Sequence, residues 1–396
     1  MDINTINEKV QISRFVKNEN IVEIVEGDII VPDIKPDILN TINTSGNVCI
    51  YKKEIMDGKL RLDGNILTNI MYLADDNSGN IRGLSTGLDF SETINIPELE
   101  SGMNVDVVTT IKSIECKVLN GRKVAIKVIL EISMKVNSQE TASIITDIND
   151  ENIQVLSTNM KINSVLGSGS TKSFVKENIA IPTTDNLVEI LSVQIYLVDK
   201  DIKISYNKVL AKSEIEVKLV YLTEDGRICT TQSRLPLVGF IDMPNIQEEN
   251  ICETSYMIRN IMIKPNSVEE HTVYIELEVE ISCVTYEEKE IKAIQDMYCP
   301  GEKMKFNKTN INTTANKQYK RNVCNIREKV SIQELENGTI IDVTITPNIT
   351  RESKMNGKIL YEGELELNFI FTDNSSVGIN SKNVITLLGG ELEKID

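Results

Sequence analysis

The feature that most constrains the fold of this chain is a long internal repeat. The segment VEGDIIVP at residues 25–32 returns as VKENIAIP at residues 175–182 and, more loosely, as IREKVSIQ at residues 326–333. Self-similarity at a fixed spacing indicates that one structural unit is written more than once. A chain of 396 residues has room for two or three domains, so a unit of about 150 residues is predicted to form one domain each time.

Further shared blocks define which parts of the unit are repeated. GNILTNIMYL at residues 64–73 corresponds to SEIEVKLVYL at residues 213–222 and to GELELNFIFT at residues 363–372. The second half of the unit occurs only twice, as IKVILEIS at residues 126–133 and IELEVEIS at residues 275–282. The chain is therefore predicted to hold two full repeats and a partial third that contains the first half only.

The repeated blocks have the alternation of β-strands. Ile215, Val217 and Leu219 would face one side of a strand, while Glu214 and Glu216 would face the other. Strict alternation favours antiparallel sheets with one face in water, and Asn-Gly and Asp-Gly pairs between such runs are typical of hairpin turns. The predicted fold is all-β, with tandem antiparallel β-sandwich or barrel-like modules. Their predicted limits are residues 1–146, 147–299 and 300–396.

Some segments are expected to lie outside the sheets. Polar composition predicts linkers at residues 137–149 and 300–316, and Gly-Ser-Gly-Ser at residues 167–170 predicts a flexible connector into the second copy. Helical signal is thin. The best candidates are short turns at residues 36–42 and 186–192, which follow the shared proline in two copies.

Charge and residue usage argue against several classes of function. The net charge of −17 disfavours nucleic acid and anionic membranes as partners. The sequence contains no run of about 18 apolar residues, so it does not predict insertion into a membrane. His271 is the single histidine of the chain, which argues against catalysis by Ser-His-Asp or Cys-His and against His-rich metal sites. We expect no enzymatic activity and no cofactor.

The seven cysteines form no CxxC pair and have neither zinc-site nor disulfide-framework spacing. Cys252 aligns with Val105 of the first copy, and Cys283 aligns with Met134, so both are expected in the core. The thiols are either small buried hydrophobes in a reduced compartment or late cross-links of an assembly that meets an oxidant. The candidates for cross-links between subunits are Cys229, Cys299 and Cys324.

The opening signature VEGDIIVPDIKPDIL at residues 25–39 resembles the SPOCS-domain family, which includes the spore-coat morphogenetic protein SipL of clostridia. The resemblance implies a sporulation protein that is made in the mother-cell cytoplasm and then placed in the spore envelope. Its implied partners are further copies of itself and other spore-envelope proteins. SipL-like chains usually end with a LysM module. We expect no such module in this sequence, so the tethering role of that module is not implied here.

The incomplete third copy suggests how such a protein would act. A β half-module leaves an apolar face or a sheet edge that must be covered, either by copy two of the same chain or by another subunit. The leading hypothesis is a structural protein of coat, exosporium or spore-surface filament that self-assembles through its β modules. The alternative is an adaptor that does not polymerise and recruits a coat morphogenetic partner or binds an envelope polymer; an enzyme comes third.

Overall fold

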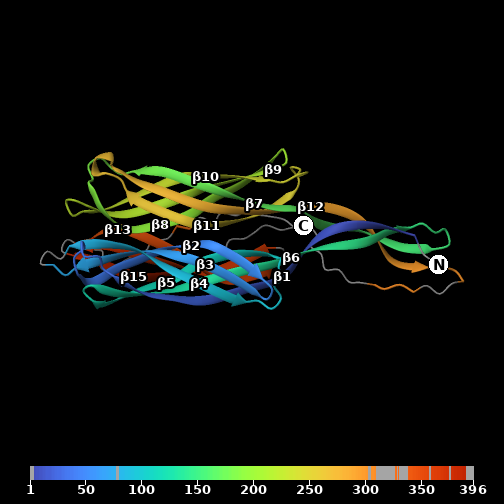
Figure 1. The fold of residues 1–396 in the computed structure, drawn as a ribbon, viewed down its shortest axis with the longest axis horizontal. Coiled ribbons are helices and arrows are strands. Elements are labelled where there is room, and N and C mark those ends of the chain that lie inside the picture. The colour runs from blue at the N-terminus through green and yellow to red at the C-terminus, as the bar shows by residue number, and fades with distance from the viewer. Residues whose placement is uncertain are drawn as a thin grey trace.

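The protein is built almost entirely of β-strands (Figure 1). In the described part of the chain, the one helix is a 3-10 turn, η1 (Val268–Glu270), and no helix is long and apolar enough to cross a membrane. The computed structural model describes residues 4–76, 80–301, 305–308, 326–327, 329, 338–355, 358–373 and 376–388.

Module 1 is a sandwich of two antiparallel sheets. One sheet contains three long strands in the order β1–β6–β5, and the other has the order β2–β3–β4. Alternate residues of the two sheets share one core, in which Ile66, Tyr72 and Leu130 are fully buried. The strands are β1 (Thr5–Ile30), β2 (Ile38–Met56), β3 (Lys59–Ala74), β4 (Ile81–Asn95), β5 (Asn104–Asn120) and β6 (Lys123–Ile148).

Module 2 repeats this arrangement strand for strand. Its long strands have the order β11–β12–β7 and its second sheet the order β10–β9–β8, with a separate core between them. The predicted all-β class with repeated antiparallel modules is confirmed, and each of the first two modules is a sandwich. The strands are β7 (Gln154–Ala180), β8 (Leu187–Ser205), β9 (Lys208–Thr223), β10 (Ile228–Asp242), β11 (Ile251–Pro265) and β12 (Thr272–Tyr298).

The third copy contributes one more sheet. Its strands β13 (Gly338–Met355), β14 (Lys358–Asp373) and β15 (Ser376–Leu388) are ordered β13–β14–β15, like β2–β3–β4 and β8–β9–β10. We call these three equivalent sheets the small sheets. Among the residues that the structure describes, no strand corresponds to β1, β5 or β6 in this copy. Most of the repeat segment at 326–333 lies outside the described residues.

An arm extends from the two sandwiches (Figure 1). The first half of β1 pairs with the end of β6, and the first half of β7 pairs with the end of β12. The two ribbons join where Ile12 of β1 lies opposite Ser164 of β7, so the long strands of both modules form one six-stranded sheet. Val10, Ile12 and Ile162 form part of a small core inside the arm.

The predicted linker at residues 137–149 is wrong, because residues 137–148 belong to β6 and pair with the first part of β1. The predicted connector at residues 167–170 is wrong as well, since these residues lie in β7. A Cβ on Gly169 would lie 2.9 Å from Cγ2 of Ile241, so the glycine admits the close approach of β10. Residues 36–42 and 186–192 were expected to form short helical turns, but they contain the starts of β2 and β8.

Candidate interaction site on the third sheet

The outer faces of the three small sheets meet in one apolar cluster. Met71 of β3, Val220 of β9 and Ile370 of β14 occupy the same position of the repeat, and all three are buried in this cluster. A second set of equivalent positions, one from the first strand of each small sheet, adds further apolar contacts: Ile42, Leu191 and Ile341. We call this group the central cluster.

The contacts around the central cluster are cyclic. β4 of module 1 lies against β8 of module 2, β10 lies against β13, and β15 lies against β2 of module 1. Each contact joins the last strand of one small sheet to the first strand of the next. The small sheets therefore form a closed ring with approximate threefold symmetry inside a single chain, and the third sheet completes it. The half-module was expected to be covered either by copy two of the same chain or by another subunit. Its outer face is covered by packing within the chain.

Polar contacts fix β13 against module 2. The amide of Gln194 donates to Oγ1 of Thr344 at 2.7 Å, and Nζ of Lys218 donates to the carbonyl oxygen of Val343 at 3.0 Å. Lys218 also forms an ion pair with Asp342, whose side chain is only 1% exposed. A buried carboxylate requires such a partner, because an unpaired charge away from water is costly.

The interface between modules 1 and 2 also contains polar contacts in this region, but different side chains make them. Ser45 and Ser192 share a hydrogen bond of 2.8 Å between their hydroxyls, and Asn47 donates to the carbonyl oxygen of Val193 at 3.0 Å. Ser45 corresponds to Gln194 in the repeat. Among the contacts between described residues, an ion pair occupies this part of the interface only where the third sheet meets module 2.

The inner face of the third sheet is covered unevenly. On β14, Leu367, Phe369 and Phe371 are buried. On β13, Val343 is half-buried, whereas Ile345 is 52% exposed and Ile349 is 64% exposed. These three residues of β13, which we call the β13 row, lie on an edge strand of their sheet. In module 2, the equivalent residues of the first two, Val193 and Ile195, pack into the sandwich core.

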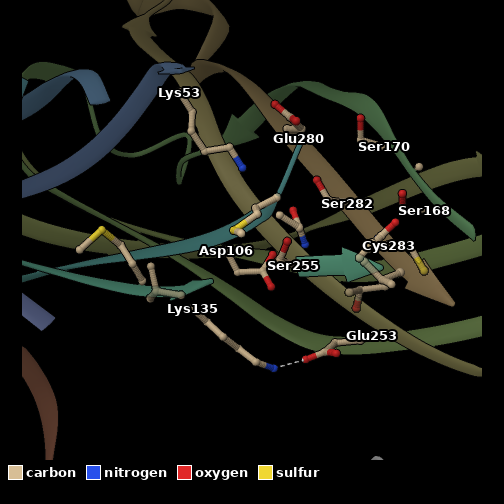
Figure 2. A pocket seen from close by; sticks show the side chains of 18 of the residues that line it. Lys53, Asp106, Lys135, Ser168, Ser170, Glu253, Ser255, Glu280, Ser282 and Cys283 are labelled. Carbon is tan, nitrogen blue, oxygen red and sulfur yellow. Dashed lines mark hydrogen bonds and ion pairs between the residues drawn. The ribbon is translucent and has the colours of Figure 1, made fainter. Parts of the chain in front are cut away.

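A cavity of about 690 Å³, lined by both polar and apolar residues, lies between modules 1 and 2 (Figure 2). Lys135 of β6 and Glu253 of β11 form an ion pair of 2.7 Å in this cavity, which ties the two modules together. Lys53 donates to the carbonyl oxygen of Val105 at 2.9 Å. Burial lowers the pKa of Lys53, although the neighbouring Glu280 favours its charged form.

The predicted cross-linking cysteines are not gathered into one site. Cys229 is half-buried at the start of β10, and burial raises the pKa of its thiol. Cys299 is half-buried and directly follows β12, at the arm. Cys324 lies outside the described residues. The alignment of the copies correctly placed Cys252 and Cys283 in the core.

His271 has a structural position in the turn before β12. Its Nδ1 lies 3.1 Å from the carbonyl oxygen of Asp185, in the loop that follows β7. At the same place in module 1, Arg122 donates to the carbonyl oxygen of Lys35 at 2.7 Å. Both side chains thus hold the loop between the first two strands of their module. Among the described residues, no three His, Cys, Asp or Glu side chains form a group that could hold a metal ion.

Comparison with known families matches the SipL, SPOCS domain family twice, at residues 37–119 and at residues 187–266. The first match runs from β2 to β5 and the second from β8 to β11, so equivalent strands of both modules are recognised. Most of the signature at residues 25–39 lies just before the first match. Comparisons with curated proteins and with solved structures found no match. These two matches support a SPOCS-domain family protein, and that family implies a sporulation-related role.

Proposed function

We propose that this chain is a non-enzymatic scaffold of the bacterial spore envelope that self-assembles through contacts between its β modules. The observation that supports assembly most directly is the β13 row, because the equivalent residues of module 2 are covered by a second sheet. The SPOCS domains support the sporulation context. Coat, exosporium and spore-surface filament are the layers in which such a scaffold would act.

The β13 row combines two features that favour docking of a further strand. Exposed isoleucines gain free energy when they leave water, about 25 cal/mol for each Å² of apolar surface that is buried. An edge strand also presents backbone N–H and C=O groups to an incoming strand. We propose that strands of a second copy cover the row. A contact between two different surfaces of identical subunits continues into a filament unless it closes into a ring.

The proposed location follows from this role. The protein would be made in the mother-cell cytoplasm during sporulation and then incorporated into the spore envelope, together with other envelope proteins. Neither nucleic acid nor insertion into a membrane has a part in the proposal. A fluorescent fusion in sporulating cells would test the location, and a signal that stays diffuse in the mother cell would contradict it.

Substitution of the β13 row tests assembly directly. In the purified full-length protein, we expect Ile345→Glu combined with Ile349→Glu to abolish large assemblies in sedimentation and negative-stain microscopy. Phe174→Glu is the matched control, because Phe174 is 55% exposed on β7, a strand of the six-stranded sheet. The control should assemble like the wild type.

Two results would contradict self-assembly through this surface. If the double variant assembled like the wild type, the β13 row would not be the contact. If the wild type stayed monomeric at every concentration, with and without reductant, the protein would not polymerise on its own. The second result would favour the adaptor that recruits a morphogenetic partner or binds an envelope polymer.

A further inference from the structure

The cavity between modules 1 and 2 is walled by the outer faces of their long strands (Figure 2). On β6, Ser133 lines the cavity, while the preceding Ile132 belongs to the core of module 1. On β12, Ser282 lines it, while the preceding Ile281 belongs to the core of module 2. Successive residues of a strand point to opposite faces, so the cavity lies between two sheet faces that do not form the sandwich cores.

Three serines form a row on the wall that belongs to module 2. Ser170 of β7 and Ser255 of β11 each lie opposite Ser282 of β12. Side chains that are directly opposite on adjacent strands share one face and have Cβ atoms about 5 Å apart. Farther from the arm, the same face carries charged side chains, such as the ion pair between Lys172 and Glu278. The row of small hydroxyl side chains is therefore a feature of the cavity and not of the whole face.

The wall that belongs to module 1 offers a different set of groups. Ser133, which has the repeat position of Ser282, lies between Asn20 of β1 and Val108 of β5. Asn20 is exposed, and the exposed fraction of Val108 is 61%. This wall thus presents a hydroxyl, an amide and an apolar surface to the same space.

The serine hydroxyls of the cavity are available to a ligand. Within the described part of the chain, no side-chain hydrogen bond involves the serines of the lining, which are Ser133, Ser168, Ser170, Ser255 and Ser282. Each hydroxyl has one donor and two acceptor positions. Together they can make many hydrogen bonds to a molecule that enters the cavity.

The charged side chains of the cavity are balanced within the protein. Lys135 is paired with Glu253 at 2.7 Å, and Glu280 is paired with an arginine of β11. The remaining charges of the lining, on Lys53 and Asp106, are opposite in sign and attract each other. The lining therefore favours neither an anion nor a cation, because each charge of the protein already has a counter-charge.

We propose that this cavity binds a neutral oligosaccharide. Its volume of about 690 Å³ lies within the range of about 300–1,000 Å³ that is typical of small-ligand sites. A sugar ring has hydroxyls around its edge and C–H groups on its faces. The row of Ser170, Ser282 and Ser255 suits the hydroxyls, and Val108 suits a C–H face.

The walls do not suit an added peptide strand. β7, β12 and β6 are inner strands of the six-stranded sheet, so their backbone groups are already paired. The cavity is also separate from the β13 row, which lies on the third sheet. Binding of a saccharide therefore does not depend on self-assembly through that row.

The test is saturation-transfer difference NMR of the full-length protein with maltotriose, cellotriose and N,N′,N″-triacetylchitotriose as probes. We expect magnetisation transfer to at least one of them, with an affinity that is equal at low and high salt. Ser255→Val combined with Ser282→Val should weaken binding about tenfold, because two hydrogen bonds are lost. Ser113→Val combined with Ser157→Val is the matched control, since these half-buried serines lie on β5 and β7 outside the cavity lining.

Three results would overturn this assignment. The first is no transfer to any of the three neutral probes. The second is unchanged binding by the cavity variant, which would place the sugar elsewhere on the molecule. The third is tighter, salt-sensitive binding of a cationic glucosamine trisaccharide, which would identify a charged ligand. Thermal unfolding checks that each variant folds, and Ser170→Val, at an exposed position of the same row, decides the matter if the double variant does not.

Discussion

The three small sheets are copies of one unit, but they are stabilised differently. In modules 1 and 2, the inner face of the small sheet packs on a sheet of long strands and the outer face packs in the central cluster. In the third copy, the outer face enters the same cluster through Ile370, while Ile345 and Ile349 on the inner face remain exposed. The described residues contain no strand equivalent to β5 or β6 for this sheet.

The difference shows that one sheet can be held in place from either of its faces. Modules 1 and 2 each have a sandwich core of their own and also take part in the ring. The third sheet depends on the ring, because its contacts with β10 and β2 supply the packing that a second sheet supplies elsewhere. It also depends on the ion pair between Lys218 and Asp342, which is specific to its contact with module 2.

The largest effect is expected where that ion pair is broken. Lys218→Met leaves Asp342 buried without its cation and should weaken docking of the third sheet by about 3 kcal/mol. Hydrogen exchange of the β14 amides should become faster, while exchange of β9 stays slow. Lys176→Met is the control, because Lys176 is 55% exposed in its pair with Glu276 and ion pairs at the surface contribute little to stability. Unchanged exchange of β14 would mean that the ion pair does not hold the sheet.

A smaller effect should separate two equivalent isoleucines. Ile195→Ala removes a side chain that packs on the core of module 2 and should lower the free energy of unfolding by about 2 kcal/mol. Ile345→Ala should lower it by less than about 0.5 kcal/mol, because that side chain already faces water. Denaturant titration at a concentration that prevents assembly measures both. Equal losses would show that the inner face of the third sheet is as well covered as that of module 2.

A tyrosine shared by the two modules gives a finer comparison. Tyr221 donates to Oδ2 of Asp185 at 2.7 Å, whereas Tyr72 donates to the carbonyl oxygen of Pro36 at 3.3 Å. Bonds to charged groups contribute more, so Tyr221→Phe should cost about 1.5 kcal/mol and Tyr72→Phe about 0.5 kcal/mol. Chemical unfolding of the two variants tests this order, and the reverse order would contradict it.

The last effect appears only in alkali. Burial raises the pKa of Tyr72 to about 12, from an ordinary value of 10.0. Below pH 10 the phenol is protonated in both the folded and the unfolded chain. Between about pH 10 and 12 the unfolded chain loses the proton first, so stability should decrease as the pH rises. Tyr72→Phe should make this decrease less steep in denaturant titrations, and an identical slope would argue against the assignment.

Strand periodicity predicted the cores well and the boundaries poorly. Alternating residues such as Ile215, Val217 and Leu219 are buried as expected. Residues 137–149 were misjudged because Asn, Ser and Thr are typical of loops, whereas an exposed strand of the arm needs only backbone pairing on the edge that meets β1. The β13 row was missed because alternation alone does not show whether a second sheet covers a face.

The sequence by itself determined that one strand-rich unit recurs along the chain, because repetition and period-two alternation are local properties of the chain. Only the tertiary structure decided which faces meet. The ring around Met71, Val220 and Ile370 joins residues from three different sheets. Such contacts depend on register, twist and the packing of sheets on one another, which no single segment of sequence contains.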